Sequence, residues 1–261
     1  MRNLQAIIAN YFTAYFMGVL IMGYSPVKTT MIGESWFPYA LFLSFLFIVF
    51  FNVGAFSIQK IGLIITSICQ RLSLIFPVAV GLFLFGESHS FLKSMALIMA
   101  IAAVVLINIP EKNSSQDLSA LKHFWYLPFL VLFGNGTIEL TLFYVEQHNL
   151  VTGASLDFVS ILFLLSGIWG LLFMLLFRKG FFALRDIAAG IILGIPNFFT
   201  IYLLVKALEI GWEGSVLFPV NNVAVLALTT LIGLIYFKEY LNKFNIAGLV
   251  FALLAVVLIS Q

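Results

Sequence analysis

Long apolar stretches separated by short polar ones run along the whole chain. Nine of these stretches are each about 20 residues long, enough for a helix rising about 1.5 Å per residue to cross roughly 30 Å of hydrocarbon. They cover residues 4-23, 36-58, 63-86, 91-109, 123-146, 153-177, 187-209, 214-237 and 243-260. The pattern therefore predicts an all-α integral membrane protein, a polytopic bundle of about nine transmembrane helices.

The polar connections between these helices are mostly very short, such as "QKIG" at 59-62 and "ESHS" at 87-90. Short connections make successive helices antiparallel neighbours. One connection, "PEKNSSQDLSALK" at 110-122, is longer and begins with a proline directly after an apolar helix. Because proline marks helix ends and loops, this segment is predicted to be a linker that divides the chain into two parts.

The two parts repeat each other. "AIAAVVLI" at 100-107 and "ALLAVVLI" at 252-259 share six of eight letters and lie 152 positions apart. A chance match between two helices rich in Leu, Val and Ala explains the octapeptide alone, but it is a poor explanation for the further pairs that the same offset aligns without a gap. These pairs are Ala55 with Ala207, Ile58 with Ile210, Gly62 with Gly214, Gly81 with Gly233, Phe85 with Phe237 and Glu87 with Glu239. The chain is therefore predicted to contain an internal repeat.

The number of helices in the repeat decides how the two copies are oriented. If the unit holds five helices, an odd number, the second copy enters the membrane from the opposite side. Inverted-topology repeats are typical of secondary transporters, in which two halves rock against each other and expose a central site to each face in turn.

The order of the motifs in both halves resembles the drug/metabolite transporter superfamily, in its EamA type. Members consist of two tandem five-helix modules, and "VKALEIGWEGSVLFPVNN" at 205-222, "FLFGE" at 83-87 and "IYFKE" at 235-239 look like the helix ends of such modules. No single motif is diagnostic, but the likeness covers nearly the whole chain. The resemblance implies a first module at 1-109, a linker at 110-122 and a second module at 123-261. It also implies a secondary transporter, an exporter of small metabolites such as amino acids, that works by alternating access.

The chain departs from the family pattern at its start. Under the offset of 152, Met1 falls opposite Gly153, so the helix at 123-146 has no partner in the first half. The first module then has four helices where five are expected. Either the gene product begins further upstream or this is a natural nine-helix variant, and we favour a missing first helix.

Composition agrees with a membrane location and limits the partners. Hydrophobic residues make up 62% of the chain and charged residues only 9%, which is more apolar surface than a soluble domain uses. The net charge of +2 is too small to indicate a nucleic-acid partner, and the single Cys69 excludes an intrachain disulfide. We expect a multi-pass protein of a cell membrane, a bacterial inner membrane, whose partners are the lipid bilayer and a small-molecule substrate.

The basic residues leave the orientation in the membrane open. Counted on alternate sides, one side collects Arg2, Lys60, Lys112, Lys122, Arg178, Lys179, Arg185, Lys238 and Lys243, and the other collects Lys28, Lys93 and Lys206. The positive-inside rule makes the richer side cytoplasmic and puts the C-terminus outside. The family resemblance implies a cytoplasmic C-terminus instead.

Polar side chains at membrane depth are the candidate functional residues, because each is costly in hydrocarbon unless it is paired or faces a wet cavity. Arg71 is the ninth residue of its predicted helix, too deep to reach the interface easily, and its five donors suit the carboxylate of an anionic or zwitterionic metabolite. The candidate substrate-binding residues, expected between the modules near the midplane, are Gln70, Arg71, Asn197, Asn221 and Asn222. The alternative for each is a structural ion pair or interhelical hydrogen bond.

Glu139 is the candidate for proton coupling. It is the only carboxylate near the middle of an apolar span, in "GNGTIELTLF". A carboxyl group in an apolar setting favours its protonated form, so Glu139 could take up and release a proton during a transport cycle. The alternative is that it lies in a wetter end of the helix and only faces water.

Other classes of function lack their sequence signatures. The histidines His89, His123 and His148 all lie at helix ends, and there is no HExxH motif or helix with paired carboxylates. We therefore expect no enzyme, no metal and no cofactor, and no filter stretch of a channel is visible. An intramembrane enzyme with an unrecognised Ser/His pair and a non-transporting membrane scaffold stay open as alternatives.

Overall fold

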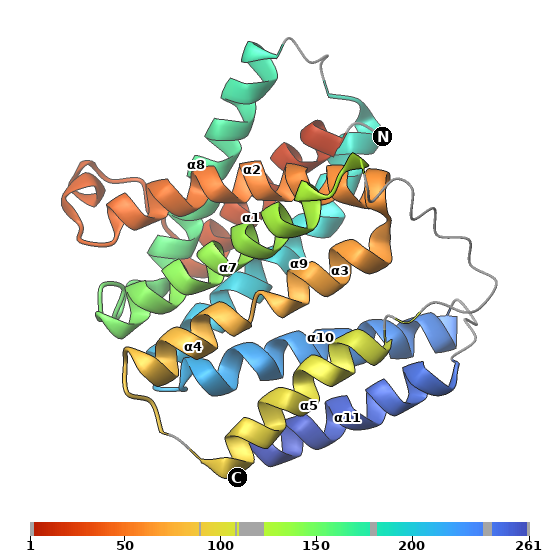
Figure 1. Cartoon of the computed structure of the whole chain (residues 1–261). Coiled ribbons are helices and arrows are strands. Elements are labelled where there is room, and N and C mark those ends of the chain that lie inside the picture. Colours follow the sequence, from red (N-terminus) through yellow and green to blue (C-terminus); the bar gives the residue numbers. More distant parts are fainter. Residues whose placement is uncertain are drawn as a thin grey trace. The chain divides into compact units, whose positions relative to one another are not determined.

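A computed structural model describes residues 3–88, 90–107, 109, 123–177, 182–236 and 242–259, and all regular structure in these residues is helical (Figure 1). A short 3₁₀ helix, Thr29–Gly33, precedes α2. The α-helices are α1 Asn3–Met22, α2 Phe37–Ile61, α3 Leu63–Leu72, α4 Ile75–Phe83, α5 Phe91–Ile107, α7 Tyr126–Gln147, α8 Ser155–Leu176, α9 Leu184–Glu209, α10 Gly214–Tyr236 and α11 Lys243–Ile259.

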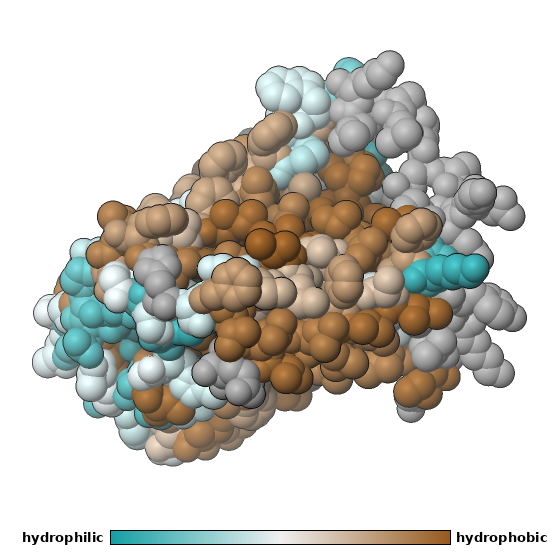
Figure 2. Space-filling model, turned by 60° about the horizontal axis from the view of Figure 1, so that its bottom comes forward, coloured by the Kyte–Doolittle hydropathy of each residue, from teal (hydrophilic) through white to brown (hydrophobic). Residues whose placement is uncertain are grey.

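Seven of the described helical segments are long and apolar enough to cross a membrane. The two remaining apolar helices, α5 and α11, are shorter. Large hydrophobic side chains are exposed along these helices, for example Leu20, Phe83 and Ile192, and Figure 2 shows hydrophobic residues over most of the face in view. Such a surface is typical of a protein that lies in lipid. The all-α class and membrane-like helices are confirmed, whereas nine spans and inverted repeats stay predictions.

The segment predicted as one span at 63-86 contains the membrane-length apolar segment Leu63–Phe83, which consists of two helices with a break between them. α3 ends at Leu72 and α4 begins at Ile75. The physical reason is Pro77, which has no N–H for the carbonyl group of Ser73 and whose ring would clash with that carbonyl in a continuous helix. The Ser73 carbonyl instead accepts the N–H of Phe76 at 3.0 Å.

Several bounds of the helices match the offset of the sequence repeat. α11 begins and ends 152 residues after α5, and α8 begins 152 residues after α1. α10 begins one residue before the position that the same offset assigns from the start of α3. The helices thus agree with the internal repeat derived from the sequence.

The chain forms two compact units, and each combines one stretch from each half of the sequence. Unit 1 holds Met1–Ala55 and Thr141–Gly211, and unit 2 holds Phe56–Leu140 and Trp212–Gln261. The units differ from the predicted modules because a unit groups residues by contact, whereas a module is a stretch of repeated sequence. The module boundaries stay a prediction, and the predicted linker at 110-122 lies outside the described residues.

In unit 1, α1 packs closely against α9 and α8. Two glycines of α9 permit this approach, since a Cβ atom on Gly190 would lie 2.3 Å from the Cβ of Ala9 and one on Gly194 would lie 2.6 Å from the carbonyl oxygen of Asn10. Small residues four apart allow two membrane helices to approach at the backbone. The sequence "GIILG" at 190-194 is therefore a helix-packing motif.

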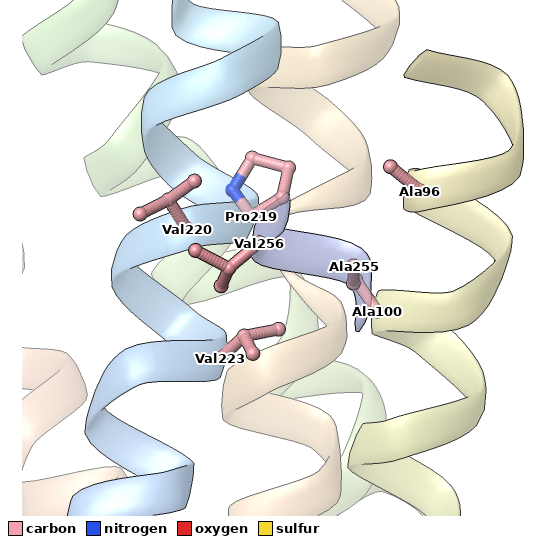
Figure 3. A pocket seen from close by; sticks show the side chains of 7 residues that line it. All are labelled: Ala96, Ala100, Pro219, Val220, Val223, Ala255 and Val256. Atoms are coloured by element: carbon pink, nitrogen blue, oxygen red, sulfur yellow. The ribbon is translucent and has the colours of Figure 1, made fainter. Parts of the chain in front are cut away.

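In unit 2, α5 and α11 lie side by side with α10 next to them (Figure 1). Their contact is built from small side chains, the buried Ala100, Ala103, Ala252 and Ala255. A narrow apolar crevice, too narrow for a water molecule, follows this contact (Figure 3). It is lined by Ala96, Ala100, Pro219, Val220, Val223, Ala255 and Val256.

Glu87, one of the repeated residues, holds the start of α10. Its buried carboxylate accepts the N–H of Gly214 at 2.6 Å and that of Ser215 at 2.8 Å. The first N–H groups of a helix have no partner within the helix, and the helix dipole favours a negative charge there. The repeated glutamate therefore has a structural role, while its counterpart Glu239 lies outside the described residues.

A second carboxylate reinforces the same end of unit 2. Glu213 accepts hydrogen bonds from the side chain of Lys93 and from the hydroxyl of Ser88, the latter at 2.8 Å. Burial raises the pKa of Glu213, but the hydrogen bonds from Lys93 and Ser88 outweigh it and hold this pKa below its ordinary value. The contact joins the start of α5 to the turn before α10.

Candidate functional site

Four polar side chains meet in unit 2 where α3 breaks from α4. Arg71 Nη1 donates a hydrogen bond to Asn222 Oδ1 at 3.4 Å, and Asn222 Nδ2 donates to Glu139 Oε1 at 3.5 Å. Both bonds are long. Ser73 Oγ lies 3.0 Å from Glu139 Oε2. We call Arg71, Ser73, Glu139 and Asn222 the polar cluster; in it, one amide links an arginine and a glutamate that are distant in the sequence.

The cluster lies within the apolar segments of unit 2. Arg71 and Ser73 belong to Leu63–Phe83, Glu139 to Tyr126–Gln147 and Asn222 to Gly214–Ile232, all of which are long and apolar enough to cross a membrane. Ser73 and Asn222 are buried, and Arg71 and Glu139 are half-buried. Arg71 and Glu139 also attract each other electrostatically. Opposite charges in low-polarity surroundings interact more strongly than in water.

Ser73 can satisfy Glu139 in either of its protonation states. Its hydroxyl has one hydrogen but two partners, Glu139 Oε2 at 3.0 Å and the carbonyl oxygen of Gln70 at 2.6 Å. An ionised Glu139 accepts the Ser73 hydrogen. A protonated Glu139 can instead donate to Ser73 Oγ, while Ser73 donates to Gln70. The arrangement can therefore hold the carboxyl group with or without a proton.

The two other predicted residues of unit 2 lie beside the cluster. Gln70 precedes Arg71 and contributes its backbone carbonyl to the contact with Ser73. Asn221 precedes Asn222 and is half-buried, and its side chain makes no hydrogen bond within the described part of the chain. The structure thus gathers Gln70, Arg71, Glu139, Asn221 and Asn222 in one region.

Asn197 lies in unit 1, where it has a partner of its own. Its Nδ2 donates to Oδ1 of the buried Asn10 at 3.2 Å, which joins the middle of α9 to the middle of α1. Pro196 lies within α9, which continues through it. The Asn10–Asn197 pair is an interhelical hydrogen bond of the kind that holds membrane helices together.

Ser73 is a site residue that hydrophobic periodicity does not reveal. The signal for it is Pro77 four residues later, because a proline at that spacing interrupts the helix at Ser73.

For metals, no three His, Cys, Asp or Glu side chains come together anywhere in the described ranges. The absence of a metal or cofactor stays a prediction.

Comparisons with known proteins find a similar fold but name no function. No family model matches the chain. A curated protein of Haemophilus influenzae (strain ATCC 51907 / DSM 11121 / KW20 / Rd), described as an uncharacterized protein, is 29% identical over 260 residues, which is 97% of this chain and 86% of that protein. A solved structure described only as "Crystal structure of protein" matches with a TM-score of 0.79 and 12% identity, over 99% of this chain and 87% of that one. At this identity the match shows a shared fold alone.

Proposed function

We propose that the chain is a secondary transporter of EamA type, an exporter of small metabolites such as amino acids that works by alternating access in a cell membrane. The observation that carries the proposal is the polar cluster, in which Arg71 and Glu139 belong to helices able to cross a membrane. Charged side chains at such depth are rare because they are costly in hydrocarbon, and they mark substrate and ion pathways.

Two features of the fold support a transporter. Transporters with internal repeats place their substrate sites at interrupted helices near the midplane, and the break between α3 and α4 lies at Ser73 within the polar cluster. The helix bounds also repeat with the offset of 152, as α5 and α11 do at both ends. We infer that the two repeats have inverted topology.

The chemistry of Arg71 favours a carboxylate-bearing substrate. A guanidinium group has five N–H donors, and within the described residues Arg71 uses one of them, toward Asn222. The others suit a substrate carboxylate, which arginine binds with paired hydrogen bonds. The amides of Gln70, Asn221 and Asn222 lie next to this position, and Asn197 is a separate candidate in unit 1. A hydrophobic cation would be repelled by the guanidinium charge.

Glu139 is proposed as the proton-coupling group of the same site. Ser73 and Asn222 contact its two carboxyl oxygens, and the Ser73 hydroxyl suits both protonation states. A protonated Glu139 is neutral and no longer attracts Arg71. Proton binding to Glu139 therefore changes the charge that Arg71 presents to the substrate carboxylate. Transport should therefore respond to a pH gradient.

The test is flux through proteoliposomes that contain the full chain, measured with a panel of labelled amino acids and hydrophobic cations, with and without a pH gradient. Arg71→Gln should weaken transport of a carboxylate substrate about 10- to 100-fold, because a hydrogen bond to a charged group contributes about 1.5 to 3 kcal/mol. Glu139→Gln should remove the response to the pH gradient. Arg185→Gln is the matched control, since Arg185 is an exposed arginine in the first turn of α9.

Three results would contradict the proposal. Unchanged carboxylate transport by Arg71→Gln would make Arg71 a structural tie and remove the argument for the substrate. Recovery of chemically altered compounds would favour an intramembrane enzyme. Flux no greater than in protein-free liposomes for the whole panel would favour a scaffold.

A further inference from the structure

Two glutamates lie at the end of unit 1 where α7 ends, α8 begins and α9 ends. Glu146 is the next-to-last residue of α7, and Glu209 is the last residue of α9. The turn between α7 and α8 passes beside Glu209, because the N–H of Gly153 donates to its carboxylate at 3.0 Å. This end of unit 1 is separate from the polar cluster, which belongs to unit 2.

Glu209 accepts hydrogen bonds from three donors. Besides Gly153, the hydroxyl of Ser155 donates to it, and so does the ammonium group of Lys206, at 3.0 Å. Three donors that converge on one carboxylate stabilise its ionised form.

Glu146 has the opposite surroundings. It is only 7% exposed, and its buried Oε1 has no hydrogen-bond partner within the described residues. The charged groups that act on it are Glu209 and Lys206 of α9. The acidic residue of α8, Asp157, accepts a hydrogen bond from Tyr24, and on α7 itself Tyr144 and His148 stack on each other. Lys206 is already bonded to Glu209.

A negative charge on Glu146 would therefore be buried, unpaired and next to a second carboxylate. Burial of an unpaired charge is far more costly than burial of a neutral carboxyl group. Two carboxyl groups that repel each other also disfavour double ionisation, so that one of them holds a proton. We propose that Glu146 and Glu209 form a second proton-binding site, in which the Glu146 carboxyl group binds a proton from water while Glu209 stays ionised.

The proton has a short path to water. The residues that follow Glu146 at the end of α7 are exposed, namely Gln147, His148 and Asn149, and so are Thr152 and Gly153 in the turn before α8. We therefore expect the site to exchange its proton with the solution at this end of unit 1. It does not depend on the proposed transport of a carboxylate or on Glu139.

Infrared spectroscopy of the full chain in lipid nanodiscs tests this site, because a protonated carboxylic acid has a carbonyl band that a carboxylate lacks. We expect such a band at neutral pH, reduced by the share of one carboxyl group in Glu146→Gln. That share should persist in Glu139→Gln, which separates the two proton sites. Glu34→Gln, an exposed glutamate of the loop after α1, is the matched control and should change nothing.

Two further variants distinguish a proton site from a merely structural role. Glu209→Gln removes the neighbouring negative charge and should move the midpoint of the Glu146 titration to lower pH, on the order of one pH unit. Lys206→Met removes a partly exposed positive charge and should move the midpoint to higher pH. An unchanged acid band in Glu146→Gln overturns the proposal. If that variant does not fold, midpoints that stay fixed in both Glu209→Gln and Lys206→Met overturn it equally.

Discussion

The contact between Glu87 and Gly81 can be tested with a double-mutant cycle. The Glu87 carboxylate holds the first N–H groups of α10, those of Gly214 and Ser215. Gly81 lies directly against this carboxylate, since a Cβ atom there would be 2.6 Å from Glu87 Oε2. Glu87→Ala removes the acceptors, and Gly81→Ala puts a methyl group where the carboxylate lies. Each change should destabilise the protein alone, but Gly81→Ala should stabilise it slightly once Glu87→Ala is present.

The magnitudes follow from the contacts. Loss of a helix N-cap costs about 1 kcal/mol, and loss of a negative charge at a partly buried helix start costs up to about 2 kcal/mol, so Glu87→Ala should cost about 2 to 3 kcal/mol. Gly81→Ala should cost about 1 to 2 kcal/mol in the wild-type chain, because overpacking outweighs the gain in helix propensity of about 1 kcal/mol. In Glu87→Ala the overpacking is gone and the propensity gain remains. The coupling free energy should be about 2 to 3 kcal/mol.

The assay is denaturant-induced unfolding of the purified full chain in detergent, followed by circular dichroism for the wild type, both single variants and the double variant. Gly33→Ala is the control, since a Cβ atom at Gly33 would meet no atom within 4 Å. Additive changes in the unfolding free energy would refute the reasoning. They would mean that the Glu87 carboxylate does not occupy the space beside Gly81.

Three further predictions concern packing, pH and topology. Gly190→Leu should separate α1 from α9 and lower the melting temperature, whereas Leu at the exposed Ala188 of the same helix should not. Because the pKa of Glu213 lies below its ordinary value, its contribution to stability is complete above the unfolded-state pKa and is lost as the pH falls through the folded-state pKa. Glu213→Gln should therefore lose less stability than the wild type as the pH falls below about 4. The difference in unfolding free energy should be less than about 1 kcal/mol, because the Glu213 side chain is partly exposed. For topology, Gln59→Cys and Ile210→Cys, each in a chain without Cys69, should react with an impermeant thiol reagent from opposite sides of the membrane. Labelling of both from one side would contradict inverted repeats.

The sequence predicts the helices well because their signal is additive over many residues. Each of the nine apolar stretches contains helix, and α5 and α11 end at the last residues of the octapeptides at 100-107 and 252-259. The break between α3 and α4 escapes prediction for the opposite reason. It depends on one residue, Pro77, within a stretch that stays apolar on both sides, and prolines also lie within α9 and α10 without ending them.

The polar cluster is predictable only in part, for reasons of chemistry. Arg71 and Glu139 stand out because a charge is rare in an apolar segment. Ser73 does not stand out, since a serine in a helix commonly bonds a carbonyl group of its own preceding turn, as Ser160 and Ser166 do at 2.6 and 2.8 Å. Sequence alone also cannot tell which amide meets which charge. Asn222 contacts Arg71 and Glu139, whereas Asn197 pairs with Asn10.

Residues that are repeated in both halves of the chain contribute to helix packing, whereas most residues of the polar cluster are not repeated. The repeated octapeptides supply the alanines between α5 and α11, and the repeated Glu87 holds the start of α10. In the polar cluster the halves differ, because the offset of 152 aligns Arg71 with Val223 and pairs Glu139 with no residue of the chain. Only Asn222 is matched in kind, by Gln70. The residues of the polar cluster that have no counterpart in the other half, Arg71 and Glu139, are therefore the ones at which we expect substitutions to change the proposed transport more than stability.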